Sequence, residues 1–101
     1  MEFNKLVRDR IPAIIEQQGE TPVTRILDGE EYLLHLERKL DEEVAEYHES
    51  GSPEELADIL EVVYALGEAQ GLSKEELISL YQAKHEARGG FSQRIFLISK
   101  Q

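Results

Sequence analysis

The sequence predicts an all-α protein, an antiparallel helical bundle of about four helices with a small two-stranded β ribbon. Apolar residues recur at helical spacing in successive segments, and capping or turn residues separate these segments. Two short stretches with strand character, residues 21–27 and 91–99, predict the ribbon. The 101 residues make a single domain, residues 1–101, and so small a core favours a homodimer or homotetramer.

The first predicted helix is short, because Pro12 lies inside an apolar pattern of helical spacing. Proline removes a backbone hydrogen bond and disfavours helical geometry at the preceding residue, so we expect a loop or turn through residues 5–11. Proline is favourable in a first turn, so the helix should begin near Pro12 and end at Gly19. The strand-like residues 21–27 follow, and Asp28 is suited to cap the next helix.

The second helix is expected over residues 30–49, where one apolar stripe runs along the segment. This stripe consists of Tyr32, Leu33, Leu36, Leu40, Val44 and Tyr47. Glu43 projects within the stripe and Glu46 lies at its edge, which is unusual for charged residues. The Ser-Gly pair at residues 50–51 ends the helix.

The third and fourth helices are both expected to begin with capping signatures. Residues 52–55 read Ser-Pro-Glu-Glu, and residues 73–76 read Ser-Lys-Glu-Glu. The third helix should run to about Ala69, and the fourth to about Ala87, before a Gly-Gly pair. The predicted core face of the third helix consists of Leu56, Ile59, Leu60, Val63 and Leu66.

Four carboxylates occupy matching positions on the second and third predicted helices. Glu43 and Glu46 are three residues apart, and so are Glu55 and Asp58, so each pair lies on one face of its helix. If the two helices pack together, four like charges meet at one point, which requires a compensating cation or proton. Ligands that are all oxygen suit Mg²⁺, or Mn²⁺, rather than Zn²⁺.

Salt bridges are the alternative explanation for part of this cluster. Lys39 lies one turn before Glu43, and Arg38 lies near Glu42. The third helix contains no lysine or arginine, so its two acids need a partner from elsewhere. Both explanations, a metal site and salt-bridged acids, stay open on spacing alone.

The composition excludes several classes of protein. A net charge of -10, from 21 acidic and 11 basic residues, argues against binding nucleic acid polymers or anionic membranes. The absence of cysteine excludes disulfides and thiolate metal sites. No apolar stretch approaches the roughly 20 residues of a membrane span, and residues 1–5 do not resemble a secretory signal, so we expect a cytoplasmic protein.

The chain resembles a known family over nearly its whole length. Its acidic double motif reads Glu-Glu-x-x-Glu at residues 42–46 and Glu-x-x-Asp at residues 55–58. This motif resembles the signature of the all-α nucleotide pyrophosphohydrolases, which include the MazG-like enzymes. Three stretches resemble a small branch described as phosphoribosyl-ATP pyrophosphohydrolase-like or MazG-like. They are Lys-Leu-Val-Arg-Asp-Arg-Ile-Pro at residues 5–12, Glu-Leu-Ala-Asp-Ile-Leu-Glu at residues 55–61 and Lys-x-x-x-Arg-Gly-Gly-Phe at residues 84–91.

The resemblance implies a dimeric, Mg²⁺-dependent hydrolase acting on phosphoanhydride bonds. Such an enzyme cleaves a nucleoside triphosphate between the α and β phosphates, giving a nucleoside monophosphate and pyrophosphate, often to clear damaged nucleotides. By motif position, the metal ligands would be Glu43, Glu46, Glu55 and Asp58. The acid that orients or deprotonates the attacking water would be Glu42. The phosphate contacts would be Lys5, Arg8, Lys84 and Arg88.

Other functions remain open at this stage. One is a non-catalytic helical dimer that binds a nucleotide or a protein partner, and another is a structural bundle whose acids are salt-bridged. Phosphoanhydride hydrolysis fits the residues because it needs charge neutralisation and an aligned water more than a protein nucleophile.

Overall fold

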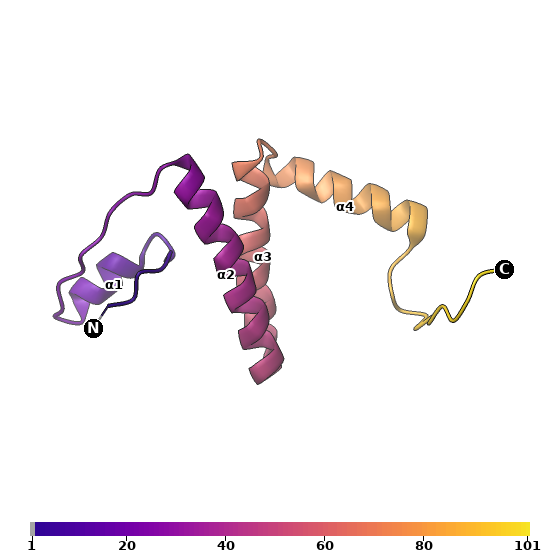
Figure 1. The fold of residues 1–101 in the computed structure, drawn as a ribbon, viewed down its shortest axis with the longest axis horizontal. Helices are drawn as coiled ribbons and strands as arrows, with labels where there is room; N and C mark the ends of the chain where they lie inside the picture. The colour runs from indigo at the N-terminus through magenta and orange to yellow at the C-terminus, as the bar shows by residue number, and fades with distance from the viewer. Residues whose placement is uncertain (1) are drawn as a thin grey trace.

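The computed structural model describes residues 2–101 and arranges them as four α-helices in an open chain (Figure 1). The helices are α1 (Ile11–Gln17), α2 (Gly29–Ser50), α3 (Pro53–Ala69) and α4 (Lys74–Arg88). Helices α2 and α3 pack as an antiparallel hairpin, and α4 extends away from the end of α3. The predicted all-α class is therefore confirmed.

Helix α2 extends one residue beyond the predicted range of 30–49 at each end, and its predicted cap and terminator are both present. The Asp28 carboxylate accepts a hydrogen bond from the Glu31 N–H at 2.9 Å. At the other end, Gly51 adopts a left-handed conformation (φ 66°), and its N–H donates to the Tyr47 carbonyl at 2.8 Å. Glycine takes this conformation without the steric cost that a Cβ imposes, so the chain can reverse at once into α3.

The starts of α3 and α4 are also fixed by serine caps. Ser52 Oγ accepts from the Glu54 N–H at 3.2 Å. Ser73 and Glu76 form a complete capping box, in which Ser73 Oγ accepts from the Glu76 N–H at 3.1 Å and Glu76 Oε1 accepts from the Ser73 N–H at 3.0 Å. Each cap satisfies backbone donors that a helix leaves unpaired at its start.

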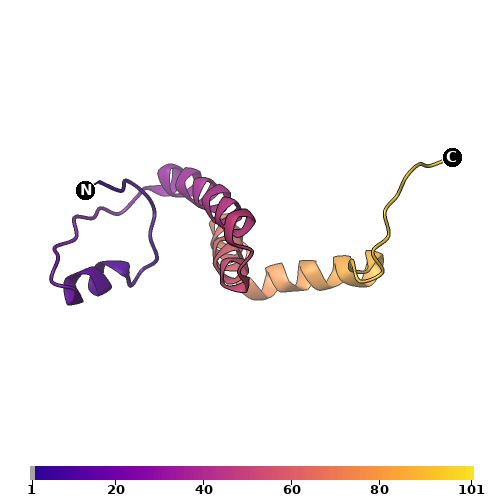
Figure 2. The same cartoon turned by 90° about the horizontal axis from the view of Figure 1, so that it is seen from below.

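The predicted β ribbon is not formed within one chain. Residues 21–27 and 91–99 contain no strand, and neither does any other part of residues 2–101. The two segments lie at opposite ends of a molecule whose longest dimension is 61 Å (Figures 1 and 2). The helices between them hold the segments apart, so their backbones cannot pair in the same chain.

The apolar core of a single chain is small. Within residues 2–101, the buried apolar side chains are Leu36 on α2 and Val62 on α3. Leu56 and Leu60, which the sequence assigns to the core face of α3, are 50% and 48% exposed, so this part of the core prediction is wrong for one chain. Helix α3 is apolar on two faces, and only one of them packs against α2.

The dimensions of the chain agree with this small core. It exposes 9189 Å², whereas a compact monomer of 11.6 kDa exposes about 5,800 Å². Its radius of gyration is 17.7 Å, against about 13 Å for a compact domain of this length. Much apolar surface is thus available for a partner. None of the helices in the described residues is both long and apolar enough to cross a lipid bilayer.

Candidate metal centre

Three of the four predicted metal ligands come together where α2 packs on α3. Glu43 lies on α2, and Glu55 and Asp58 lie in the first turns of α3. One carboxylate oxygen from each residue lies within 4.8 Å of the other two. Opposite ligands of an octahedral Mg²⁺ ion are about 4.2 Å apart, so small side-chain movements would let these oxygens hold an ion.

The tight connection between the helices sets this arrangement. Only residues 51–52 separate the end of α2 from the start of α3. With a rise of 1.5 Å per residue, Glu43 lies about 10 Å from the end of its helix and Asp58 about 8 Å from the start of the next. The two residues therefore lie at similar heights in the hairpin, on the helix faces that meet.

Within residues 2–101, Glu43 is the charged residue that is buried, with 7% of its surface exposed. Its Oε1 lies 3.5 Å from Lys39 Nζ, but its Oε2 is buried without a hydrogen-bond partner. Burial raises the pKa of Glu43, and repulsion from Glu46 and Asp58 adds to this effect, against the opposing pull of Lys39. A buried carboxylate oxygen without a partner is costly, so this oxygen fits a site for a cation.

Glu55 is in a similar environment. Its Oε2 is also buried without a hydrogen-bond partner. Burial raises the pKa of Glu55, and the neighbouring charges of Glu46, Asp58 and Glu43 raise it further. In a complete capping box Glu55 would accept from the Ser52 N–H, but that N–H donates to Ser50 Oγ instead, at 3.1 Å. Glu55 therefore serves the carboxylate cluster and not the helix cap.

Glu46 lies beside the cluster and not within it. Its side chain is exposed, and it raises the pKa of both Glu43 and Glu55. Glu46 and Glu55 also line an open depression together with Glu49 and Ser50. The depression adjoins the cluster at Glu55.

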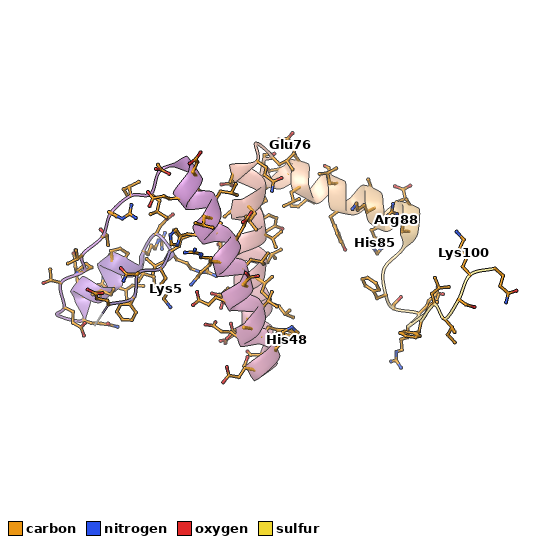
Figure 3. The ribbon with its side chains drawn as sticks, in the orientation of Figure 1. Lys5, His48, Glu76, His85, Arg88 and Lys100 are labelled. Atoms are coloured by element: carbon orange, nitrogen blue, oxygen red, sulfur yellow. The ribbon has the colours of Figure 1, made fainter. Side chains whose placement is uncertain are left out.

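The N-terminal segment brings two cations to these acids, from before α1. Arg8 Nη2 donates to Asp58 Oδ1 at 2.7 Å, and its Nη1 lies 3.8 Å from Glu61 Oε1. Lys5 Nζ donates to Glu42 Oε1 at 3.2 Å, and Figure 3 shows the Lys5 side chain beside α2. Two of the predicted phosphate contacts thus lie beside predicted site acids, Arg8 beside the metal-ligand candidate Asp58 and Lys5 beside Glu42.

Glu42 is held as an ion pair. Besides Lys5, Lys39 Nζ donates to Glu42 Oε2 at 3.4 Å. Although partial burial acts to raise the pKa of Glu42, the hydrogen bonds and charges of Lys5 and Lys39 outweigh it and lower the pKa. Glu42 is therefore ionised at neutral pH. The salt-bridge explanation is confirmed for Glu42, although its partners are Lys5 and Lys39 and not the expected Arg38, and it is confirmed in part for Glu43, which shares Lys39.

The structure separates Lys84 and Arg88 from the cluster. Both lie on α4, which leads away from the α2–α3 hairpin (Figure 1). Figure 3 shows Arg88 at the far end of α4, on the other side of the hairpin from Lys5. Within one chain, these two predicted phosphate contacts do not join Lys5 and Arg8.

Glu61 is a second acid beside Arg8, and the sequence motifs assign it no role. A signal for it exists, because Glu61 follows Asp58 by three residues and so continues the same helix face. The cation that approaches this face, Arg8, lies 50 positions away from Asp58. No local pattern connects residues so distant in the sequence.

A relative of unknown function resembles part of the chain. Over 42 residues, the chain is 60% identical to an uncharacterized protein of Mycolicibacterium smegmatis (strain ATCC 700084 / mc(2)155), which covers 42% of this chain and 43% of that protein. The chain thus matches less than half the length of that relative. No family model matches the chain, and no solved structure matches it.

Proposed function

We propose that the chain is a Mg²⁺-dependent nucleotide pyrophosphohydrolase of the MazG-like class. It would cleave a nucleoside triphosphate between the α and β phosphates, giving a nucleoside monophosphate and pyrophosphate. The observation that supports this proposal most is the buried, unpartnered Oε2 of Glu43 beside Glu55 and Asp58. Burying a carboxylate oxygen without a partner costs free energy, and a bound cation would compensate this cost. The donor set consists only of oxygens, which suits Mg²⁺ or Mn²⁺.

The acids of the hairpin would divide into two roles. Glu43, Glu55 and Asp58 would hold the cation, and Glu46 would join them from the exposed edge. When bound, the cation supplies charge neutralisation at the phosphate oxygens. Glu42, ionised because Lys5 and Lys39 lower its pKa, would accept a hydrogen bond from the attacking water and orient it.

The two cations of the N-terminal segment would bind the phosphates. A guanidinium group matches phosphate oxygens with two parallel N–H donors, and a lysine ammonium adds a point charge. Arg8 already lies 2.7 Å from Asp58, so it would need to move only a short way from this acid to a phosphate held at the same place. Arg8 and the cation would also compete for Asp58 when no nucleotide is bound.

We further propose that the working protein is a homodimer. One chain exposes about 3,300 Å² more than a compact monomer of its mass. Permanent homodimers bury about 2,000–5,000 Å² in total, or about 1,000–2,500 Å² on each copy, so a second copy on the apolar face with Leu56 and Leu60 would cover a large part of this excess. Lys84 and Arg88 would then reach phosphate from the second copy, because α4 leads away from the acids of its own chain.

A pyrophosphate-release assay over normal and modified nucleoside triphosphates, with Mg²⁺ or Mn²⁺, tests the activity. We expect release from at least one nucleotide, with the matching monophosphate as second product. Glu43→Gln and Asp58→Asn should lower the rate at least about 100-fold, because each removes a ligand charge. Glu75→Gln, on exposed α4, is the matched control and should keep the rate. No release with either metal would rule out the activity, and equal rates in all variants would rule out this carboxylate cluster as its site.

A second candidate is a helical dimer that binds nucleotides without cleaving them. One observation favours it. Lys5 pairs with Glu42 and Arg8 pairs with Asp58, whereas a catalyst would need Glu42 to orient water and Asp58 to hold the metal ion. Calorimetry would support this candidate if it detected nucleotide binding while the same sample released no pyrophosphate under either metal.

A further inference from the structure

The C-terminal segment exposes a run of large apolar side chains. Ile95, Phe96, Leu97 and Ile98 are 81%, 87%, 77% and 88% exposed. No backbone–backbone hydrogen bond reaches residues 95–99 from the described part of the chain. Unpaired backbone and consecutive exposed apolar residues make a segment that readily pairs with another strand. The segment therefore lacks the partner that its composition requires.

A second segment with the same character precedes α2. Val23 and Ile26 are 97% and 94% exposed, and residues 22–27 make no backbone–backbone hydrogen bond within residues 2–101. Arg25 holds this segment at the start of α2 through two hydrogen bonds to the Glu31 carboxylate, at 3.1 Å and 2.7 Å. This ion pair links the segment to α2, while the backbone donors and acceptors of the segment remain available.

The charges that flank the two segments favour pairing between them over pairing of either with itself. Glu20 and Asp28 flank the first segment, whereas Arg94 and Lys100 flank the second. If two copies of the C-terminal segment paired with each other in antiparallel fashion, Arg94 would lie near Lys100. Like charges opposite one another destabilise a strand pair, and opposite charges stabilise it by about 0.2–1 kcal/mol per pair.

Geometry excludes this pairing within one chain. The two segments lie at opposite ends of the molecule, and Figure 3 shows Lys100 on the far side of the helices from Lys5 (Figures 1 and 3). Helix α4 alone is about 22 Å long and carries the C-terminal segment away from α2. A partner for the segment must come from another molecule.

We infer that residues 22–27 of one copy and residues 95–99 of a second copy pair as neighbouring β-strands. In a two-fold symmetric dimer each copy gives its C-terminal segment to the other, so two such ribbons form. This inference rests on the proposed homodimer and not on the proposed hydrolysis. It gives a specific partner to the exposed apolar residues of both segments.

The chain has no cysteine, so introduced cysteines are the only thiols. The test mixes a full-length chain carrying Val23→Cys with a tagged full-length chain carrying Phe96→Cys, and treats the mixture with a short bifunctional thiol reagent. We expect the mixed product to exceed either self-linked product at least about fivefold. A mixture of Glu75→Cys with Phe96→Cys is the matched control, and it should give little product.

Light scattering on the same samples measures the oligomeric state, so it distinguishes failure of the strand pairing from failure of the dimer. A dimer in which only the Phe96→Cys chains link to each other would overturn the inference and leave the dimer standing. A monomer at micromolar concentration would overturn both, and the pyrophosphate assay would still decide on the activity independently. As a second variant, Phe96→Asp should weaken the dimer at least tenfold, while unchanged dimerisation would contradict the pairing.

Discussion

Arg8 Nη2 donates a hydrogen bond to Asp58 Oδ1 across 2.7 Å, so a cation from the N-terminal segment neutralises one of the three clustered carboxylates. The other two, Glu43 and Glu55, each keep a buried oxygen without a partner. The cluster is therefore only partly neutralised by the protein itself. Its remaining negative charge is what we expect of a site that binds a divalent cation.

Removing the Arg8 charge should strengthen metal binding. In Arg8→Gln, Asp58 no longer has a competing cation, so Mg²⁺ should bind about twofold to fivefold more tightly in the absence of nucleotide, as expected for a partly exposed ion pair. Isothermal titration calorimetry measures this affinity. Arg25→Gln, which disrupts an ion pair away from the cluster, is the control and should leave the affinity unchanged. Weaker metal binding in Arg8→Gln would contradict the competition.

Glu43→Gln should affect stability in opposite directions with and without metal. In the presence of a chelator, removing a buried charge relieves burial and repulsion, so the variant should melt a few degrees higher, equivalent to about 1 kcal/mol. With millimolar Mg²⁺, the natural chain should gain stability by ligand linkage and the variant should gain little. Thermal melts followed by circular dichroism measure both. Equal Mg²⁺ effects on the two proteins would argue against a metal site at Glu43.

The free energy of unfolding of the metal-free chain should depend on pH in the way expected for a glutamate whose pKa is raised on folding. Folding raises the pKa of Glu55 above its ordinary value of 4.5, so the folded state binds its proton more tightly than the unfolded state. This contribution to stability is fully present below pH 4.5 and is lost as pH rises through the folded-state pKa. Relative to Glu55→Gln, the natural chain should therefore become less stable on going from pH 4.5 toward neutrality.

The pKa of Glu42 shifts in the opposite direction from that of Glu55, so Glu42 should have the opposite effect on the pH dependence of stability. Its pKa is lowered below 4.5, so its contribution to stability is present above pH 4.5 and is lost as pH falls through the folded-state pKa. Denaturant unfolding at a series of pH values, in chelator, separates the two behaviours. The same pH trend in Glu42→Gln and Glu55→Gln would contradict the assigned environments.

Leu60→Asp should disrupt assembly more than it disrupts the hairpin. Leu60 is 48% exposed on the face of α3 that does not pack against α2, so a charge there should be tolerated in one chain. In a dimer it would be buried without a partner, and we expect at least a tenfold weaker association. Sedimentation velocity measures the association, and circular dichroism checks that the helical content is kept. Unaltered assembly would place the interface elsewhere.

Much of the helical structure is local, and the sequence predicts it well for that reason. The caps at Asp28, Ser52 and Ser73 each act within three residues, and the left-handed turn at Gly51 depends on a single residue. The meeting of Glu43 with the acids of α3 follows from helical spacing and a two-residue connection. These features need no knowledge of distant contacts.

The remaining features depend on contacts that no local pattern contains. Periodicity shows that α3 is apolar, but not which of its two apolar faces meets α2, so Val62 is buried where Leu60 was expected. The strand character of residues 94–99 indicates that this segment needs a pairing partner, but it does not indicate where that partner lies. The Arg8–Asp58 pair spans 50 positions and depends on the path of the whole N-terminal segment.

Electron paramagnetic resonance of Mn²⁺ tests the metal centre most directly, because the signal of free Mn²⁺ falls when the ion binds. The natural chain should remove the free signal until about one equivalent of Mn²⁺ is bound, and Glu75→Gln should do the same, whereas Glu43→Gln should leave most of the signal unchanged. A full free signal in the presence of the natural chain, or equal binding by Glu43→Gln, would contradict a metal centre at Glu43, Glu55 and Asp58.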